Sequence, residues 1–233
     1  YRMKFFHMAD LHLGRKLLGE PLWKEQQDLL SQVLRMADEE KPGAVLLCGD
    51  IYDKSIPSQE AVGLLDWFLE EMSVRGIQVF LISGNHDGAQ RLQFASGILK
   101  KEGIHIAGTF KGRAEHIMLT DQFGPLHVWM LPFLRPGMLR PFAEEIPETY
   151  EEAVKTALPG AKLHKEERNV LLAHQFVTAG GERPEISDSE QHSLGGMDQV
   201  DASVFEAFDY VALGHIHRPQ KIGDVKIRYA GSP

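Results

Sequence analysis

Aspartate, asparagine and histidine recur directly after short apolar runs in this sequence. Four motifs have this form, and a lone His174 follows a fifth run; the motifs are Asp10-Leu11-His12, Gly49-Asp50-Ile51-Tyr52-Asp53, Gly84-Asn85-His86-Asp87 and Gly214-His215-Ile216-His217. In open α/β sheets, ligands bind beyond the carboxyl ends of the strands, so we expect these side chains to meet at one place. Carboxylate, imidazole and amide oxygen ligands suit Mn²⁺, Fe²⁺ or Zn²⁺. The motifs therefore predict a metal centre.

The spacing within the motifs favours two metal ions. Asp10 and His12 are two residues apart, which places both side chains on the same side of an extended segment, and His215 and His217 share this spacing. Asp50 could bridge two ions. Two ions roughly 3.5–4 Å apart orient a phosphate and neutralise the charge that develops during its hydrolysis. The predicted ligands are Asp10, His12, Asp50, Asn85, His174, His215 and His217.

Other residues of the motifs are expected to act without binding metal. His86 adjoins Asn85, so we expect it to protonate the leaving oxygen or to stabilise the transition state. Asp53 and Asp87 are expected to orient a ligand or a loop. An isolated Asp-x-His pair would carry little information; the joint pattern is what is specific. The remaining histidines are interpreted as structural or surface residues, namely His7, His105, His116, His127, His164 and His192.

The elements that position these motifs alternate along the first part of the chain. Strands are expected at residues 3–8, 44–48 and 78–82, and helices at 23–40, 58–75 and 90–101. This order is typical of an α/β layered fold. After residue 103 we expect a helix at 149–158, a long polar loop at 180–199, and strands at 105–107, 116–120, 126–131, 169–173, 210–213, 221–222 and 227–230. The pattern predicts sheets packed as a sandwich with helices outside.

Composition sets further bounds. The 233 residues, 43% of them hydrophobic, suffice for one large domain or two small ones. No apolar run approaches the roughly 20 residues that cross a bilayer, so no membrane partner is expected. Cys48 is the only cysteine, which excludes an intramolecular disulfide and favours a cytoplasmic location. The net charge of −8 argues against nucleic acid as a partner, but bound cations would offset carboxylates where a phosphate would lie.

The four motifs, with His174 between them, resemble the signature of the calcineurin-like metallophosphoesterase superfamily over nearly the whole chain. The resemblance implies a sandwich of two mixed β-sheets flanked by helices, and phosphoester hydrolysis with two metals. Residues 7–15, 49–53, 208–220 and 229–233 are similar to the SbcD/Mre11 nucleases within that superfamily. That similarity implies a DNA nuclease, with double-strand exonuclease and single-strand endonuclease activity in DNA replication, repair and recombination. It also implies an SbcC-type ATPase partner and Mn²⁺ as the preferred ion.

By matching positions, the resemblance assigns one ion to Asp10, His12, Asp50 and His217, and the other to Asp50, Asn85, His174 and His215. It implies a homodimer formed through helices near the active site, for which residues 58–75 and 90–101 are the candidates. Arg15, Lys16 and Arg91 lie near motif loops and are candidates for contacts with DNA phosphates, although ordinary surface charge explains them equally well.

On the same resemblance, residues 1–233 form the nuclease domain, and the ending at 230–233 suggests that capping and partner-binding segments would follow it. Two alternative functions remain open on the sequence alone. One is a phosphomonoesterase or small-molecule phosphodiesterase on the same fold, because a fold does not fix its substrate. The other is a non-catalytic scaffold for the ATPase.

Overall fold

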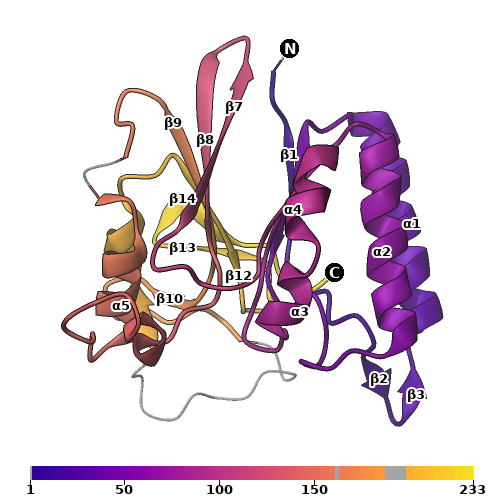
Figure 1. Cartoon of the computed structure of the whole chain (residues 1–233), viewed down its shortest axis with the longest axis horizontal. Coiled ribbons are helices and arrows are strands. Elements are labelled where there is room, and N and C mark those ends of the chain that lie inside the picture. The colour runs from indigo at the N-terminus through magenta and orange to yellow at the C-terminus, as the bar shows by residue number, and fades with distance from the viewer. Residues whose placement is uncertain (1, 161–162, 187–197) are drawn as a thin grey trace.

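Two β-sheets packed face to face form the centre of the molecule, with helices on both outer sides (Figure 1). The structure is a computed structural model that describes residues 2–160, 163–186 and 198–233. His192 and most of the polar loop expected at 180–199 lie outside these residues. The predicted α/β sandwich is confirmed.

The smaller sheet is parallel throughout, in the order β1-β4-β5-β6. Its strands are β1 (Phe5–Met8), β4 (Ala44–Cys48), β5 (Gln78–Ile82) and β6 (Ile104–Ala107). They are joined by α1 (Trp23–Glu40), α2 (Gln59–Val74), α3 (Ala89–Gln93), α4 (Ser96–Leu99) and the 3-10 turn η1 (Lys100–Glu102). Because both faces of β4 are covered, every residue of this strand is buried.

The larger sheet is mixed, in the order β13-β14-β12-β9-β8-β7. Its strands are β7 (Glu115–Asp121), β8 (Gly124–Leu131), β9 (Arg168–His174), β12 (Tyr210–Gly214), β13 (Gln220–Ile222) and β14 (Asp224–Tyr229). The pairs β7–β8 and β13–β14 are antiparallel, and the inner pairs are parallel. Both sheets therefore contain neighbouring parallel strands, and residues at the carboxyl ends of these strands can form a site.

Shorter elements complete the fold. On the outer side of the larger sheet are η2 (Pro136–Leu139), α5 (Tyr150–Ala157) and η4 (Ala202–Phe205). Two small ribbons pair β2 (Lys16–Leu17) with β3 (Glu20–Pro21), and β10 (Phe176–Thr178) with β11 (Gln199–Asp201). In the described part of the chain, no helix has both the length and the apolar character needed to cross a bilayer.

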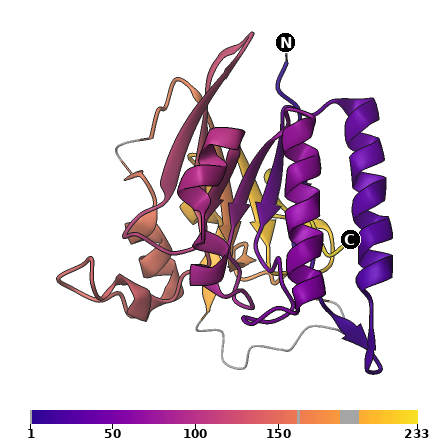
Figure 2. The same ribbon diagram turned by 45° about the vertical axis from the view of Figure 1, so that its right-hand side comes forward.

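Three apolar clusters hold the layers together. Leu46, Phe80 and Ile82 of the smaller sheet meet Met130 and Leu172 of the larger sheet in the cluster between the sheets. A second cluster fixes α1 and α2 to the smaller sheet, and a third fixes α5 and η4 to the larger one. Figure 2 shows α1 and α2 side by side on one outer face. The strand ends therefore project from a rigid, close-packed body.

Local sequence explains most helix boundaries. The hydroxyl of Ser58 accepts a hydrogen bond from the backbone of Ala61 and caps α2. Thr149 and Glu152 form a reciprocal capping box at the start of α5.

The prediction of a single helix at residues 90–101 was wrong. Phe94 is extended and Ala95 is left-handed with φ 59°, so the chain breaks into α3, α4 and η1. At the break, the side-chain oxygen of Gln93 accepts hydrogen bonds from the backbone of Gly108 and Thr109. These bonds tie the end of α3 to the turn after β6, which overrides the helical pattern of the sequence.

Candidate metal centre

The seven predicted ligands come together at the carboxyl ends of β1, β4, β5, β9 and β12. Three overlapping groups bring potential ligand atoms within 4.8 Å of one another: Asp10 with His12 and His217, His12 with Asp50 and His86, and Asp10 with Asp50 and His174. Asn85 and His215 join through direct contacts with His174 and with each other. The expected convergence of strand ends is therefore present.

One half of the centre surrounds the side-chain oxygen of Asn85. This oxygen lies 3.1 Å from Nε2 of His174 and 3.0 Å from Nδ1 of His215. Nε2 of His174 is also 3.4 Å from Oδ2 of Asp50. Potential ligand atoms of Asn85, His174, His215 and Asp50 thus lie close together.

The other half is formed by His12, His217 and Asp10. Nε2 of His12 lies 3.1 Å from Nε2 of His217, so two ring nitrogens point at each other. Oδ2 of Asp50 is 3.9 Å from Nε2 of His12. The same Asp50 oxygen therefore faces both halves, as a bridging carboxylate must.

Strained backbone presents several of these side chains. Among the described residues, seven other than glycine have positive φ, and four of them are predicted ligands: Asp10 at 54°, His12 at 44°, Asp50 at 47° and His215 at 97°. Such conformations cost roughly 1–3 kcal/mol each and cluster at functional sites. Gly49, at φ 83°, precedes Asp50, and a Cβ there would collide with the ring of His174.

Electrostatics at the centre fit a cation. Asp10 and Asp50 are almost fully buried, and buried carboxylates need compensating charge. Burial acts to lower the pKa of His174, but Asp50 and Asp10 outweigh it and raise this pKa to about 9. Burial likewise acts to raise the pKa of Asp50, yet His174 and the backbone of His86 hold it below its usual value. In the metal-free protein, a proton on His174 thus supplies positive charge to the carboxylates.

The other imidazoles are suited to ligation. Burial lowers the pKa of His12 to about 4 and that of His215 to about 3, with the neighbouring histidines lowering both further. Both rings are therefore neutral near pH 7, as metal ligands must be. Nδ1 of His12 is buried without a hydrogen bond and lies 3.7 Å from Oδ1 of Asp53. This places the carboxylate of Asp53 beside the ring of His12.

His86 lies at the open side of the centre, with a side chain 46% exposed. Its Nδ1 is 3.1 Å from the carbonyl oxygen of Asp53, and its Nε2 is 3.9 Å from Oδ2 of Asp50. A carbonyl oxygen only accepts, so Nδ1 carries a proton and Nε2 is left for proton transfer.

Two buried side chains hold the motif loops in place. Asp87 accepts hydrogen bonds from the backbone N–H groups of Ile51, Tyr52 and Gly84, which joins the second and third motifs. Burial raises the pKa of Asp87 to about 6, against the effect of these three bonds.

Sequence reasoning missed the second of these side chains, Gln26 of α1. Its amide donates to the carbonyl oxygens of Leu11 and His12 and accepts from the backbone of Gly14. A glutamine four residues before Leu30, on the apolar face of a helix, is the signal that could have revealed it.

The candidates for DNA contact lie around the centre rather than in it. Arg15 is half-buried just after the first motif, and its charge helps to lower the pKa of His12. Lys16 on β2 and Arg91 on α3 are exposed.

Comparison with known proteins agrees with this architecture. The chain matches the calcineurin-like phosphoesterase family over residues 3–219. It is 33% identical, over 235 aligned positions, to the SbcD component of the SbcCD nuclease of Staphylococcus epidermidis; the alignment covers 99% of this chain and 61% of that protein. The chain thus spans less than two thirds of the length of this relative.

Two solved structures resemble the fold at low sequence identity. One is a dimetal phosphatase from Danio rerio, with a TM-score of 0.53, 15% identity, and coverage of 97% of this chain and 85% of that one. The other is GAP50, described as the anchor in the inner membrane complex of Plasmodium, with a TM-score of 0.56, 14% identity, and coverage of 97% and 70%. With the family match across most of its length, the chain belongs to the calcineurin-like phosphoesterases, a family of metal-dependent hydrolases.

Proposed function

We propose that this chain is the nuclease component of a DNA-processing complex and hydrolyses phosphodiester bonds with two Mn²⁺ ions. The observation that carries the proposal is the 33% identity to the SbcD component of the SbcCD nuclease over 99% of the chain, and the close approach of the seven predicted ligand residues supports it. The proposed activities are double-strand exonuclease and single-strand endonuclease, used in DNA replication, repair and recombination. Residues 1–233 are proposed to form the nuclease domain of this component.

In this proposal, Asp10, His12, Asp50 and His217 hold one ion, and Asp50, Asn85, His174 and His215 hold the other. The support is geometric, because Oδ2 of Asp50 faces His12 on one side and His174 on the other. The donor set of oxygen and imidazole nitrogen suits Mn²⁺, and Fe²⁺ or Zn²⁺ would also bind it.

The ions, when bound, would neutralise phosphate charge and lower the pKa of an attacking water. The protein residues set the geometry of the reaction. Asp53 and the carbonyl oxygen of Cys48 orient the rings of His12 and His174, and Asp87 fixes the loops that carry Asp50 and Asn85. His86, held by the carbonyl oxygen of Asp53, would donate a proton from Nε2 to the leaving oxygen.

The proposed partners are DNA, an SbcC-type ATPase and a second copy of this chain. Arg15, Lys16 and Arg91 are proposed to meet phosphates near the centre. Phe94, directly after α3, and Ile98, on α4, are 81% and 71% exposed, which supports a dimer contact there. The proposed cytoplasmic location rests on Cys48, a single cysteine that is buried.

Mn²⁺-dependent cleavage of end-labelled single- and double-stranded DNA by the purified protein tests the proposal. The control is Asp50→Ala, which removes the proposed bridging ligand. We expect the wild type to cleave DNA and the variant to be inactive. If a phosphomonoester is hydrolysed while DNA stays intact, even with the ATPase partner added, the substrate is a small phosphoester and the nuclease proposal is wrong.

A further inference from the structure

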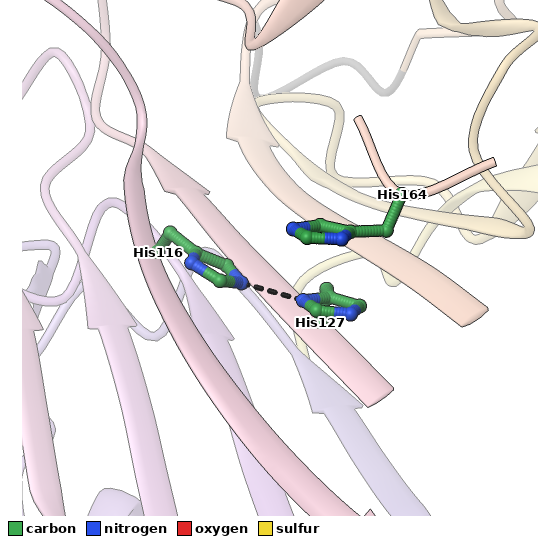
Figure 3. A group of neighbouring side chains, drawn as sticks. All are labelled: His116, His127 and His164. Atoms are coloured by element: carbon green, nitrogen blue, oxygen red, sulfur yellow. Dashed lines mark hydrogen bonds between the residues drawn. The ribbon is translucent and has the colours of Figure 1, made fainter. Parts of the chain in front are cut away.

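A second group of histidines lies away from the metal centre. His116 on β7, His127 on β8 and His164 in the turn before β9 bring ring nitrogens within 4.8 Å of one another. Figure 3 shows the three rings gathered on one side of the β7–β8 pair. The rings of His127 and His164 are parallel, with centroids 4.0 Å apart. The sequence alone favours separate structural or surface roles for these residues; the fold makes them a cluster.

The group is far from the candidate active site. His127 pairs with Asn169 at the start of β9, whereas His174 ends the same strand. Five residues of strand correspond to about 16 Å, so this cluster and the dinuclear centre lie at opposite ends of the sheet. Any ion bound by the cluster is therefore separate from the catalytic ions.

Surrounding contacts fix the cluster in place. The side-chain amide of Asn169 donates to the carbonyl oxygens of His164 and Glu167, each at 2.7 Å. The indole of Trp129 donates to the side-chain oxygen of Asn169. Trp129 also stacks on the ring of His116, with centroids 4.3 Å apart. The turn carrying His164 is thus held over the strands by hydrogen bonds from the side chain of Asn169.

The hydrogen bonds assign the protons in the buried ring. Nε2 of His127, which is 2% exposed, bonds to the carboxylate of Glu167. A carboxylate accepts, so Nε2 donates, and in the neutral ring Nδ1 carries a lone pair. That lone pair points at Nε2 of His116, 2.7 Å away. A histidine that donates to a carboxylate and offers its other nitrogen has the arrangement typical of metal ligands.

The neighbouring rings complete a donor set. Burial, and then the charges of His127 and His164, lower the pKa of His116, which favours its neutral form. The side chain of His164 is exposed, which leaves its ring room to turn toward the other two rings; its Nδ1 lies 3.6 Å from Glu167. A groove of about 810 Å³, lined by His116, Trp129 and His164 among others, gives an ion access from solvent.

We propose that His116, His127 and His164 form a third metal site, selective for Zn²⁺, that fastens the β7–β8 pair to the turn before β9. Three imidazoles with a carboxylate on the buried ring suit Zn²⁺ better than Mn²⁺, which prefers oxygen ligands. Binding displaces the proton shared between His116 and His127. The ion stabilises the folded protein by mass action, because the unfolded chain lacks the preformed site.

The proposed site is tested by counting the Zn²⁺ ions bound by a variant that lacks its two exposed ligands. The variant is the double substitution His116→Gln with His164→Gln, which leaves the buried His127 and its bond to Glu167 in place. The matched control is His105→Gln, which removes an imidazole that contacts Gln78 and belongs to neither cluster. Equilibrium dialysis against Zn²⁺ should give three ions per chain for the wild type and the control, and two for the double variant.

A second readout is the unfolding temperature in saturating Mn²⁺. Added Zn²⁺ should raise it in the wild type and in His105→Gln, but not in the double variant, whose circular dichroism verifies folding. Equal zinc stoichiometry in the wild type and the double variant would overturn the proposal. So would an equal rise in unfolding temperature, and the cluster would then be a metal-free hydrogen-bonded stack.

Discussion

Nδ1 of His174 lies 2.7 Å from the carbonyl oxygen of Cys48 and donates a hydrogen bond to it, although the two residues are 126 positions apart. Cys48 ends β4 in the smaller sheet, and His174 ends β9 in the larger one. The bond therefore joins the two sheets at the edge where the candidate metal centre lies. It also fixes the tautomer: Nδ1 keeps its proton, so Nε2, which faces Asn85 and Asp50, is the nitrogen that can lose a proton and bind a metal ion.

Replacing His174 tests the assignment of ligands. We expect His174→Gln to bind one Mn²⁺ tightly in place of two, because the pocket around Asn85 loses its buried imidazole. Affinity for the second ion should fall more than about 100-fold, since even residues that only orient ligands contribute 10–100-fold. Titration of bound Mn²⁺ by electron paramagnetic resonance measures this, with His105→Gln as the control. Two tightly bound ions in His174→Gln would remove this residue from the centre.

Asp87 is expected to act on metal binding without touching metal. In Asp87→Asn, an amide NH₂ replaces an oxygen that accepts from backbone N–H groups, so the loops carrying Asp50 and Asn85 loosen. We expect Mn²⁺ affinity to fall about 10–100-fold, with cleavage largely restored at high Mn²⁺. Asp66→Asn, on the exposed side of α2, is the matched control. A loss of activity that no Mn²⁺ concentration restores would contradict a purely positioning role.

The contribution of His86 to the rate of hydrolysis is expected to be larger for substrates with poorer leaving groups. His86→Ala should bind two Mn²⁺ ions normally but cleave DNA about 10²–10⁴-fold more slowly, because a general acid contributes about that much. An aryl phosphodiester has a leaving group that needs no proton, so its hydrolysis should change far less. Both substrates are measured with the same enzyme preparation, so that each substrate serves as the control for the other. Equal losses on the two substrates would mean that His86 does not protonate the leaving oxygen.

The main elements could be predicted because their patterns are local. The bounds of α1, β4 and β5 agree with the sequence prediction, since each is a long helical repeat or an apolar run between turn residues. The motifs could likewise be placed at strand ends.

What could not be predicted depends on distant contacts. The ribbons β2–β3 and β10–β11 are two or three residues long and carry no pattern of their own. The break at Phe94 and Ala95 depends on Gln93 reaching the turn after β6. Positive φ at Asp50 or His215 is imposed by the folded site, because neither residue type requires it. The cluster of His116, His127 and His164 exists only once β7, β8 and the turn before β9 are assembled.

His7 predicts a pH dependence of stability that is separate from the metal centre. Its Nε2 lies 3.0 Å from the carbonyl oxygen of Leu213, and its Nδ1 lies 3.0 Å from the hydroxyl of Tyr210. The carbonyl oxygen only accepts, so Nε2 donates and Nδ1 accepts, and the neutral ring satisfies both partners. Burial lowers the pKa of His7 to about 4, with Arg228 contributing and the bond to Leu213 opposing.

The direction of the effect follows from proton binding. In the unfolded chain the pKa is near 6.5, so between about pH 6.5 and pH 4 the unfolded state binds a proton that the folded state does not. His7 therefore lowers the free energy of unfolding as the pH falls through this window, by about 2 kcal/mol between pH 8 and pH 5. His7→Phe should remove this difference, whatever it does to absolute stability, because Leu213 keeps a backbone partner in Ala230.

Urea unfolding of the metal-free protein at pH 8 and pH 5 measures the contribution, since chelation removes the separate loss of metal at low pH. The comparison is between wild type, His7→Phe and the exposed control His164→Gln. We expect the wild type and the control to lose stability in parallel on acidification, and His7→Phe to lose about 2 kcal/mol less. If all three lose the same amount, the proton is taken up at another group, and His7 does not set the pH dependence.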